Sequence, residues 1–194
     1  MKDHKNAYLS IAALVVAVIG LSVAYAALSA TLNVNFGNVS QSAMTWNVGF
    51  QTGNVTGTAS GTSTTGLTCG TATVTADTAT IGNTTLSKPG DTCTYALTIQ
   101  NTGSIDANLA TITPTTPTGI TCSPATGGNM VCGNMTYKLT TDAAGSTILT
   151  NNRVLSANTG TLPVYLVVSY TGGDVNDSAV TQAGAAFTLV YNQA

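Results

Sequence analysis

Hydrophobic and polar residues alternate along much of this chain. The longest regular stretch runs from Thr92 to Gln100, where Cys93, Tyr95, Leu97 and Ile99 occupy every second position and polar or small residues fill the others. Successive side chains of a β-strand point to opposite faces, so this period of two predicts a strand with one buried face. Cys93 is then expected on the inner face.

Similar alternation recurs in five other stretches, separated by segments rich in Gly, Asn, Asp, Ser and Pro such as 57–66 and 113–119. These stretches are Leu32–Phe36, Trp46–Phe50, Met135–Leu139, Val164–Tyr170 and Phe187–Tyr191. Several short strands at this spacing predict an all-β fold, a sandwich or a barrel. Trp46 is interpreted as a core residue of its strand. The helical signal is weak and is confined to 177–185, where Gly184 interrupts it.

A turn precedes the longest strand. Pro89 presets φ for the second position of a β-turn, and Gly90 accepts the positive φ that a type II turn requires at the third. Lys88 and Asp91 flank this pair. The chain is therefore expected to reverse here and to enter the strand at Thr92.

The N-terminus has the pattern of an export signal. Lys2, His4 and Lys5 form a basic region, 11–18 is apolar, and Ala24-Tyr25-Ala26 supplies the small-x-small motif that signal peptidase cleaves. We expect residues 1–26 to be a hydrophobic leader helix that is removed, which leaves 27–194 as one domain. The alternative is a retained membrane anchor, since the uncharged run 7–30 is long enough to span a bilayer.

Composition excludes several classes of function for the exported chain. The 194 residues contain five Lys and Arg, seven Asp, one His and no Glu, and removal of 1–26 leaves 168 residues with three basic side chains, six Asp and no His. Ser-His-Asp triads, Cys-His dyads and HExxH metal sites are thereby excluded, so we expect neither enzymatic activity nor a cofactor. The absence of a basic patch argues against nucleic acid and anionic membrane surfaces as partners.

Residues 174–177 resemble part of a calcium loop but lack its later bidentate carboxylate. A plain turn is therefore favoured, and no metal site is assigned.

Four cysteines, Cys69, Cys93, Cys122 and Cys132, remain after removal of the leader. An even number of cysteines in an exported chain, without a C-x-x-C pair, predicts disulfides. Three pairings are formally possible. We favour Cys122 with Cys132, because Ser123-Pro124 and Gly127-Gly128 between them are typical of a hairpin bend or compact loop, and this leaves Cys69 with Cys93.

The segment LSKPGDTCTYALTIQNTGSIDANL, 86–109, resembles the TasA/camelysin (CalY) family of secreted matrix proteins of Gram-positive bacteria, in which a leucine and a KPGD corner precede an alternating strand that ends in N-x-G-S. The resemblance implies a jelly-roll-like or Ig-like β-sandwich whose subunits polymerise into extracellular fibres. An N-terminal strand of one subunit would then complete the sheet of the next. Some members of the family are described as proteolytic. Because the mature chain lacks His and Glu, we do not extend that activity to it.

The segment 27–38 fits such a donor strand on physical grounds as well. After cleavage it is a free end with Leu32, Val34 and Phe36 on one face, and open strand edges favour pairing. We therefore expect a secreted or cell-surface structural subunit of a fibre or biofilm matrix, a homopolymer with no contact to the membrane after cleavage. The alternatives are that this strand pairs within its own domain, and that the protein is a monomeric surface-displayed adhesion or binding module.

Overall fold

The computed structural model describes residues 42–63, 65–172 and 181–194. The predicted leader and the predicted strand Leu32–Phe36 lie outside these ranges. Residues Ala43–Ala194 form one compact unit. Within its described residues the secondary structure is β-strand and turn, without a helix, and every strand pairing is antiparallel.

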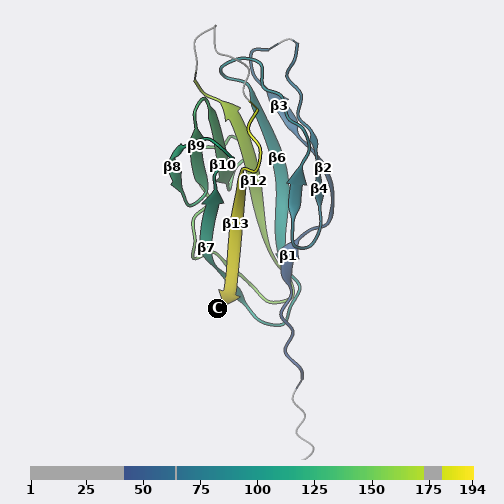
Figure 1. The fold of residues 1–194 in the computed structure, drawn as a ribbon. Helices are drawn as coiled ribbons and strands as arrows, with labels where there is room; N and C mark the ends of the chain where they lie inside the picture. Colours follow the sequence, from purple (N-terminus) through teal and green to yellow (C-terminus); the bar gives the residue numbers. More distant parts are fainter. Residues whose placement is uncertain (1–41, 64, 173–180) are drawn as a thin grey trace, which may run out of the picture. The chain divides into compact units, whose positions relative to one another are not determined.

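One layer is a seven-stranded sheet (Figure 1). Its long central pair, β6 with β12, keeps an unbroken register from Asn101 opposite Gly160 to Thr92 opposite Ser169. The outer edge of β6 is covered by β1 at one end and by β3 at the other. The strands in sheet order are β1 (Val48–Phe50) and β3 (Thr58–Ser60), β6 (Thr92–Asn101), β12 (Gly160–Tyr170), β10 (Met135–Thr140), β9 (Asn129–Cys132) and β8 (Cys122–Thr126).

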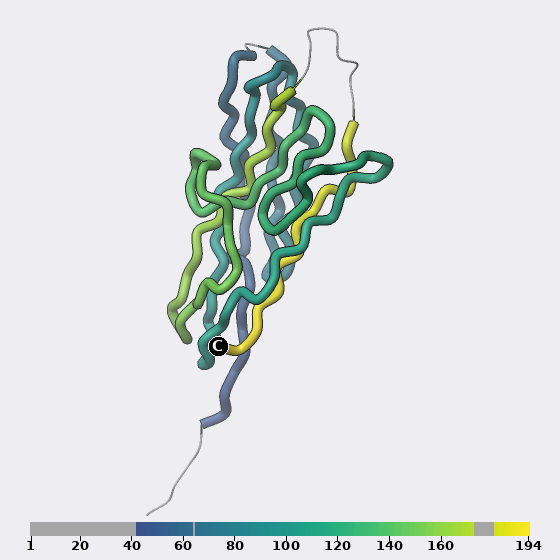
Figure 2. The backbone as a smooth tube through the Cα atoms, turned by 90° about the vertical axis from the view of Figure 1, so that its left-hand side faces the viewer, coloured from purple at the N-terminus to yellow at the C-terminus, as the bar shows by residue number. Residues whose placement is uncertain are grey.

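The other layer consists of two separate three-stranded sheets. The first contains β11 (Val154–Leu155), β7 (Ala107–Thr115) and β13 (Ala186–Gln193). The second contains β2 (Gly53–Thr56), β4 (Thr71–Val74) and β5 (Ala79–Ile81). Figure 2 shows β7 and β13 side by side along most of their length.

The core lies between the layers and has the composition that the alternation predicts. Cys93, Tyr95, Leu97 and Ile99 of β6 are all buried, and Val164 of β12 faces Leu97 across the ladder. Burying an apolar side chain of this size contributes about 1.5–3 kcal/mol. The expected inner face of the longest strand is therefore confirmed.

Five of the six predicted strands lie in described residues, and each corresponds to an observed strand: β1, β6, β10, β12 and β13. The interpretation of Trp46 as a core residue is wrong, because its side chain is 46% exposed and precedes β1. Two segments interpreted as connections also contain strand: 58–60 forms β3, and 113–115 is the end of β7. The described part of the weak helical segment, 181–185, has no regular structure.

Candidate functional site

In the part of the chain that the structure describes, the two three-stranded sheets leave two strand edges unpaired in the same layer. At the margins of the sandwich β11 contacts β12 and β2 contacts β6, so these outer strands adjoin the seven-stranded layer. The opposite edges belong to β13 and β5, and neither has a further strand partner among the described residues. Unpaired backbone N–H and C=O groups along such an edge form a template for another strand.

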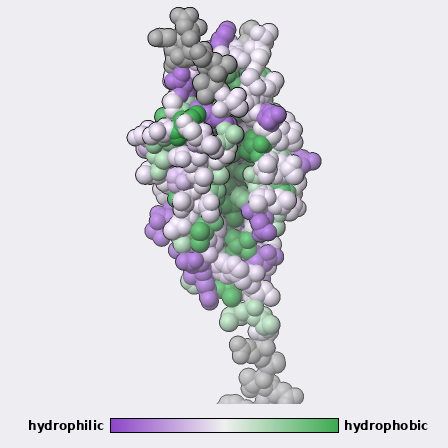
Figure 3. Space-filling view, viewed as in Figure 1, coloured by the Kyte–Doolittle hydropathy of each residue, from purple (hydrophilic) through white to green (hydrophobic). Residues whose placement is uncertain are grey.

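Apolar side chains line the space between these edges. Phe187, Leu189 and Tyr191 of β13 and Ala79 and Ile81 of β5 pack against the core but remain partly exposed. Figure 3 shows a hollow with hydrophobic residues running along the unit in this layer, between β13 on one side and the sheet of β2, β4 and β5 on the other. We call this hollow the groove.

Leu162 and Leu166 of β12 share the inward face with Val164 and are also only partly buried. Leu162 and Leu166 of the seven-stranded sheet are thus partly accessible to solvent. A groove with apolar walls and two open strand edges has the shape and the chemistry to accept one more β-strand.

Tyr191 is the groove residue with a polar atom. Burial raises the pKa of its hydroxyl to about 12. That hydroxyl oxygen is buried and has no hydrogen-bond partner among the described residues. A buried hydroxyl without a partner loses its hydration without compensation, so the Tyr191 oxygen contributes little to the stability of the fold.

The chain enters the unit at the end where β13 finishes. The Thr45 N–H donates to Ser104 Oγ at 2.8 Å, the Ser104 N–H donates to the Thr45 carbonyl at 2.8 Å, and the Thr102 N–H donates to the Asn47 carbonyl at 2.9 Å. At the same end the Ala194 N–H donates to the carbonyl of Asp106 at 3.0 Å. We call this the entry end. Met44 and Trp46, 66% and 46% exposed, lie on this segment.

The Lys88-Pro89-Gly90-Asp91 corner lies at the opposite end, which we call the corner end. The Asp91 N–H donates to the Lys88 carbonyl at 3.0 Å, and Gly90 has φ of 94°, as a type II turn requires. The Tyr170 N–H donates to the Asp91 carbonyl and the Gly90 N–H to the Tyr170 carbonyl, which ties the corner to the end of β12. The predicted turn is confirmed.

The side chain of Asp91 organises this end. Oδ1 accepts the N–H of Ser63 at 3.1 Å, and Oδ2 accepts the Ser63 hydroxyl at 2.5 Å and the N–H groups of Ser87 and Lys88 at 2.8 Å. Burial by itself would raise the pKa of this carboxyl, but these hydrogen bonds outweigh it and lower the pKa to about 2. Gly61 is needed beside it, because a Cβ there would overlap the carboxylate. Asp91 is therefore a structural anion.

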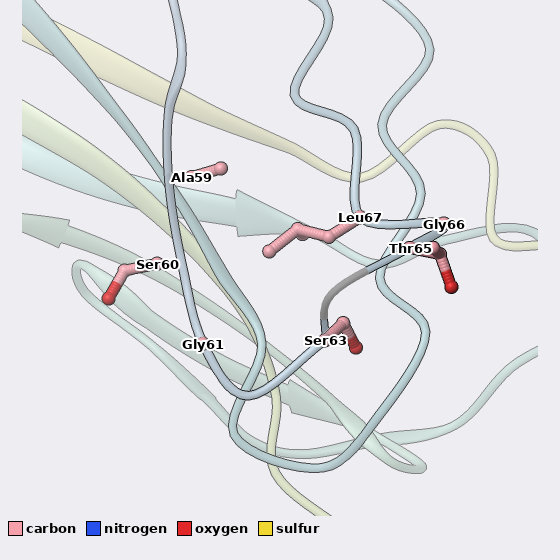
Figure 4. A pocket seen from close by; sticks show the side chains of 7 residues that line it. All are labelled: Ala59, Ser60, Gly61, Ser63, Thr65, Gly66 and Leu67. Carbon is pink, nitrogen blue, oxygen red and sulfur yellow. The ribbon is translucent and has the colours of Figure 1, made fainter.

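A second hollow, of about 470 Å³, lies beside this anchor (Figure 4). Its described lining is Ala59, Ser60, Gly61, Ser63, Thr65, Gly66 and Leu67. None of these side chains can exchange a proton near neutral pH. The hollow therefore offers hydroxyl groups and one leucine but no acid-base pair for catalysis.

The structure has both predicted disulfides, Cys69–Cys93 and Cys122–Cys132. Cys122 and Cys132 are directly opposite in the β8–β9 hairpin, which turns at Gly127-Gly128. Ser123-Pro124 is part of β8, so the expectation that it belongs to the bend is wrong. Cys93 is on the buried face of β6, and its partner Cys69 precedes β4. This bridge joins the two layers of the sandwich.

The candidate donor residues Leu32, Val34 and Phe36 lie outside the described residues, as does the calcium-like segment 174–177. In the described ranges no group of three or more His, Cys, Asp or Glu side chains could hold a metal ion. The same ranges contain no helix that is long and apolar enough to cross a membrane.

The walls of the groove were not identified as a site from the sequence. The strand Phe187–Tyr191 was predicted, and a signal was present in it, because its three inward apolar residues at every second position repeat the pattern of Leu32–Phe36. Ala79 and Ile81 gave no such signal, since β5 has only three residues.

Comparison with known proteins finds no matching protein family, no similar curated protein and no similar solved structure.

Proposed function

We propose that this protein is a structural subunit of an extracellular fibre or biofilm matrix, and that the segment 27–38 of an identical subunit fills the groove. The observation that carries the proposal is the pair of open edges, β13 and β5, in one layer of the sandwich. One added strand would join two three-stranded sheets into one seven-stranded sheet. The result is a jelly-roll-like sandwich completed by its neighbour.

The gain in free energy follows from burial and backbone pairing. Leu32, Val34 and Phe36 would each contribute about 1.5–3 kcal/mol if fully buried against the groove walls. The same strand would satisfy the open backbone groups of β13 and remove an exposed edge. Repeated from subunit to subunit, this contact is heterologous and produces an open filament.

The remaining properties of the chain are consistent with this role. Signal peptidase would remove residues 1–26, and the two disulfides suit a non-reducing compartment outside the cell. The resemblance of 86–109 to the TasA/camelysin family supports the same class of function. We propose a role in assembly rather than catalysis, without a cofactor or a nucleic acid partner.

The test compares two charge substitutions in neighbouring residues of the mature chain, 27–194. Val34→Asp places a carboxylate on the face that enters the groove, where an unpaired charge is costly, whereas Asn35→Asp adds the same charge to the other face. Negative-stain microscopy should show filaments for the wild type and for Asn35→Asp and none for Val34→Asp. Circular dichroism should show the same β-structure for all three.

Two results would contradict the proposal. Filaments of wild-type length from Val34→Asp would show that this segment does not enter a groove. A wild-type chain that stays monomeric while Val34→Asp unfolds would show that the segment completes its own domain, and would favour the monomeric adhesion module.

A further inference from the structure

We propose that the inserted segment runs antiparallel to β13 and parallel to β5, with Phe36 opposite Phe187, Val34 opposite Leu189 and Leu32 opposite Tyr191. This inference rests on the proposed function and adds the direction and the register of the donor strand. It follows from the directions of the two open edges and from the place where the chain enters the unit.

The two open edges run in opposite directions. β7 begins at the entry end, directly after the turn that follows β6, and β13 is antiparallel to β7, so β13 runs from the corner end to the entry end. β5 begins after the turn 75–78, and the Phe50 N–H donates to the Ala76 carbonyl of that turn at 2.8 Å near the entry end. β5 therefore runs from the entry end toward the corner end. A strand inserted between them is antiparallel to one and parallel to the other.

The direction of the donor relative to β13 depends on whether it comes from a second copy or from the same chain. In a head-to-tail filament the entry end of one subunit faces the corner end of the next, so the donor enters the groove at the corner end. Its residues nearest position 42 then lie at the corner end and residue 27 lies toward the entry end. The donor thus runs antiparallel to β13. A segment folded back into its own groove would enter at the entry end and run parallel to β13.

Two observations favour a second copy as the source. Residues 43–47 continue the line of β1 past the entry end and point away from the groove, as Figures 1 and 2 show. The hydrogen bonds of Thr45 and Asn47 to 102–104 hold them in this direction. A donated strand also makes its antiparallel ladder with the longer edge, since β13 has eight residues and β5 has three. Antiparallel pairing is the slightly more stable arrangement.

The register follows from matching the apolar positions. Residues directly opposite each other in a ladder point to the same face, so the inward residues of the donor must oppose the inward residues of β13. Both strands carry three such residues at every second position, Leu32, Val34 and Phe36 in one and Phe187, Leu189 and Tyr191 in the other. One antiparallel register pairs all three. The six residues 37–42 that remain can span roughly 20 Å between the groove and the donor's own unit.

Engineered disulfides distinguish the two directions. Thr31 and Asn192 are on the outward faces and are directly opposite in the proposed register, whereas Thr31 meets Ala186 if the strand runs parallel to β13. The experiment uses the mature chain with Thr31→Cys/Asn192→Cys or with Thr31→Cys/Ala186→Cys, purified with its native disulfides, allowed to assemble, oxidised and run on non-reducing gels. Thr31→Cys alone is the control for random thiol pairing. Asn192 and Ala186 are six residues apart, roughly 20 Å, so a register slip of two residues does not confuse them.

The inference predicts a ladder of covalent multimers from Thr31→Cys/Asn192→Cys, with at least ten times less cross-linking from the other pair and from the control. Multimers mainly from Thr31→Cys/Ala186→Cys would overturn the direction but leave donation by a second copy intact. A cross-linked monomer from that pair would overturn both, because the segment would lie in its own groove. Filaments without cross-linking in either pair would overturn the placement beside β13.

Discussion

Removing the charge of Asp91 is predicted to destabilise this fold strongly, because the carboxylate is buried and accepts four hydrogen bonds. In Asp91→Asn the amide keeps one acceptor oxygen and loses the charge, so at least one of the N–H groups of Ser63, Ser87 and Lys88 then faces an NH₂ donor. Hydrogen bonds to a charged group contribute about 1.5–3 kcal/mol, and a buried donor without a partner costs about 1–3 kcal/mol. Ser87 and Lys88 are exposed, so water can replace part of what their N–H groups lose, and we expect a total loss of about 2–4 kcal/mol in the free energy of unfolding.

Urea unfolding of the mature chain followed by circular dichroism measures this loss. Asp106→Asn is the matched control, because Asp106 is exposed and its carboxylate accepts one hydrogen bond, from the Ala157 N–H at 2.7 Å. With a urea slope of about 2 kcal/mol per molar, Asp91→Asn should lower the midpoint by roughly 1–2 M and Asp106→Asn by less than about 0.5 M.

The pH dependence adds a second readout. The pKa of Asp91 is about 2 in the folded protein and about 3.9 in an unfolded chain, so its contribution is complete above about pH 4 and is lost as the pH falls toward 2. The wild type should lose stability over this interval more steeply than Asp91→Asn. Equal midpoints for the Asp91 and Asp106 variants, or the same acid dependence in wild type and Asp91→Asn, would refute the reasoning.

Further predictions concern the disulfides and the hydroxyl groups of Tyr191 and Tyr95. The two disulfides have sequence separations of 24 and 10. Loop-closure entropy predicts that the free energy of unfolding falls by ~3.5 kcal/mol when Cys69 and Cys93 are both changed to Ala, and by ~2.8 kcal/mol when Cys122 and Cys132 are. A lower urea midpoint for the second variant than for the first would contradict this. Tyr191→Phe should leave the free energy of unfolding within about 0.5 kcal/mol of wild type or raise it, because its hydroxyl has no partner among the described residues. Tyr95→Phe should lower the free energy of unfolding by about 1 kcal/mol, because the Tyr95 hydroxyl lies 2.6 Å from Thr84 Oγ1. Equal losses in Tyr95→Phe and Tyr191→Phe would show that the Tyr191 hydroxyl is paired.

The strands that the sequence predicted correctly are those whose alternation is long and regular. β7 was missed because a register irregularity opposite Val190–Tyr191 breaks its period: Ala107 and Leu109 are buried, but the next inward residue is Ile112. β4 has a regular pattern, with Ala72 and Val74 buried. Four alternating residues are too few, however, to distinguish a strand from a loop rich in threonine. Local patterns of this kind fail where a strand is short or bulged.

The groove could not be predicted from local sequence in the same way. Its walls come from β5 and β13, more than a hundred positions apart in the chain, and it exists because no described strand joins these edges. The sequence shows which residues alternate, whereas the order of strands in a layer depends on long-range pairing. The disulfides were predictable because one pair closes a local hairpin and the other pair was then determined.

Binding of the isolated segment tests the central claim most directly. A fluorescein-labelled peptide of residues 27–38 is titrated into a mature chain that lacks these residues and therefore has an unoccupied groove, and fluorescence anisotropy is measured. The account predicts saturable binding of one peptide per chain, binding at least tenfold weaker for the peptide with Val34→Asp, and unchanged binding for the peptide with Asn35→Asp. A folded chain that does not bind the peptide, or that binds the two variant peptides equally, would contradict the claim that this groove receives the N-terminal segment.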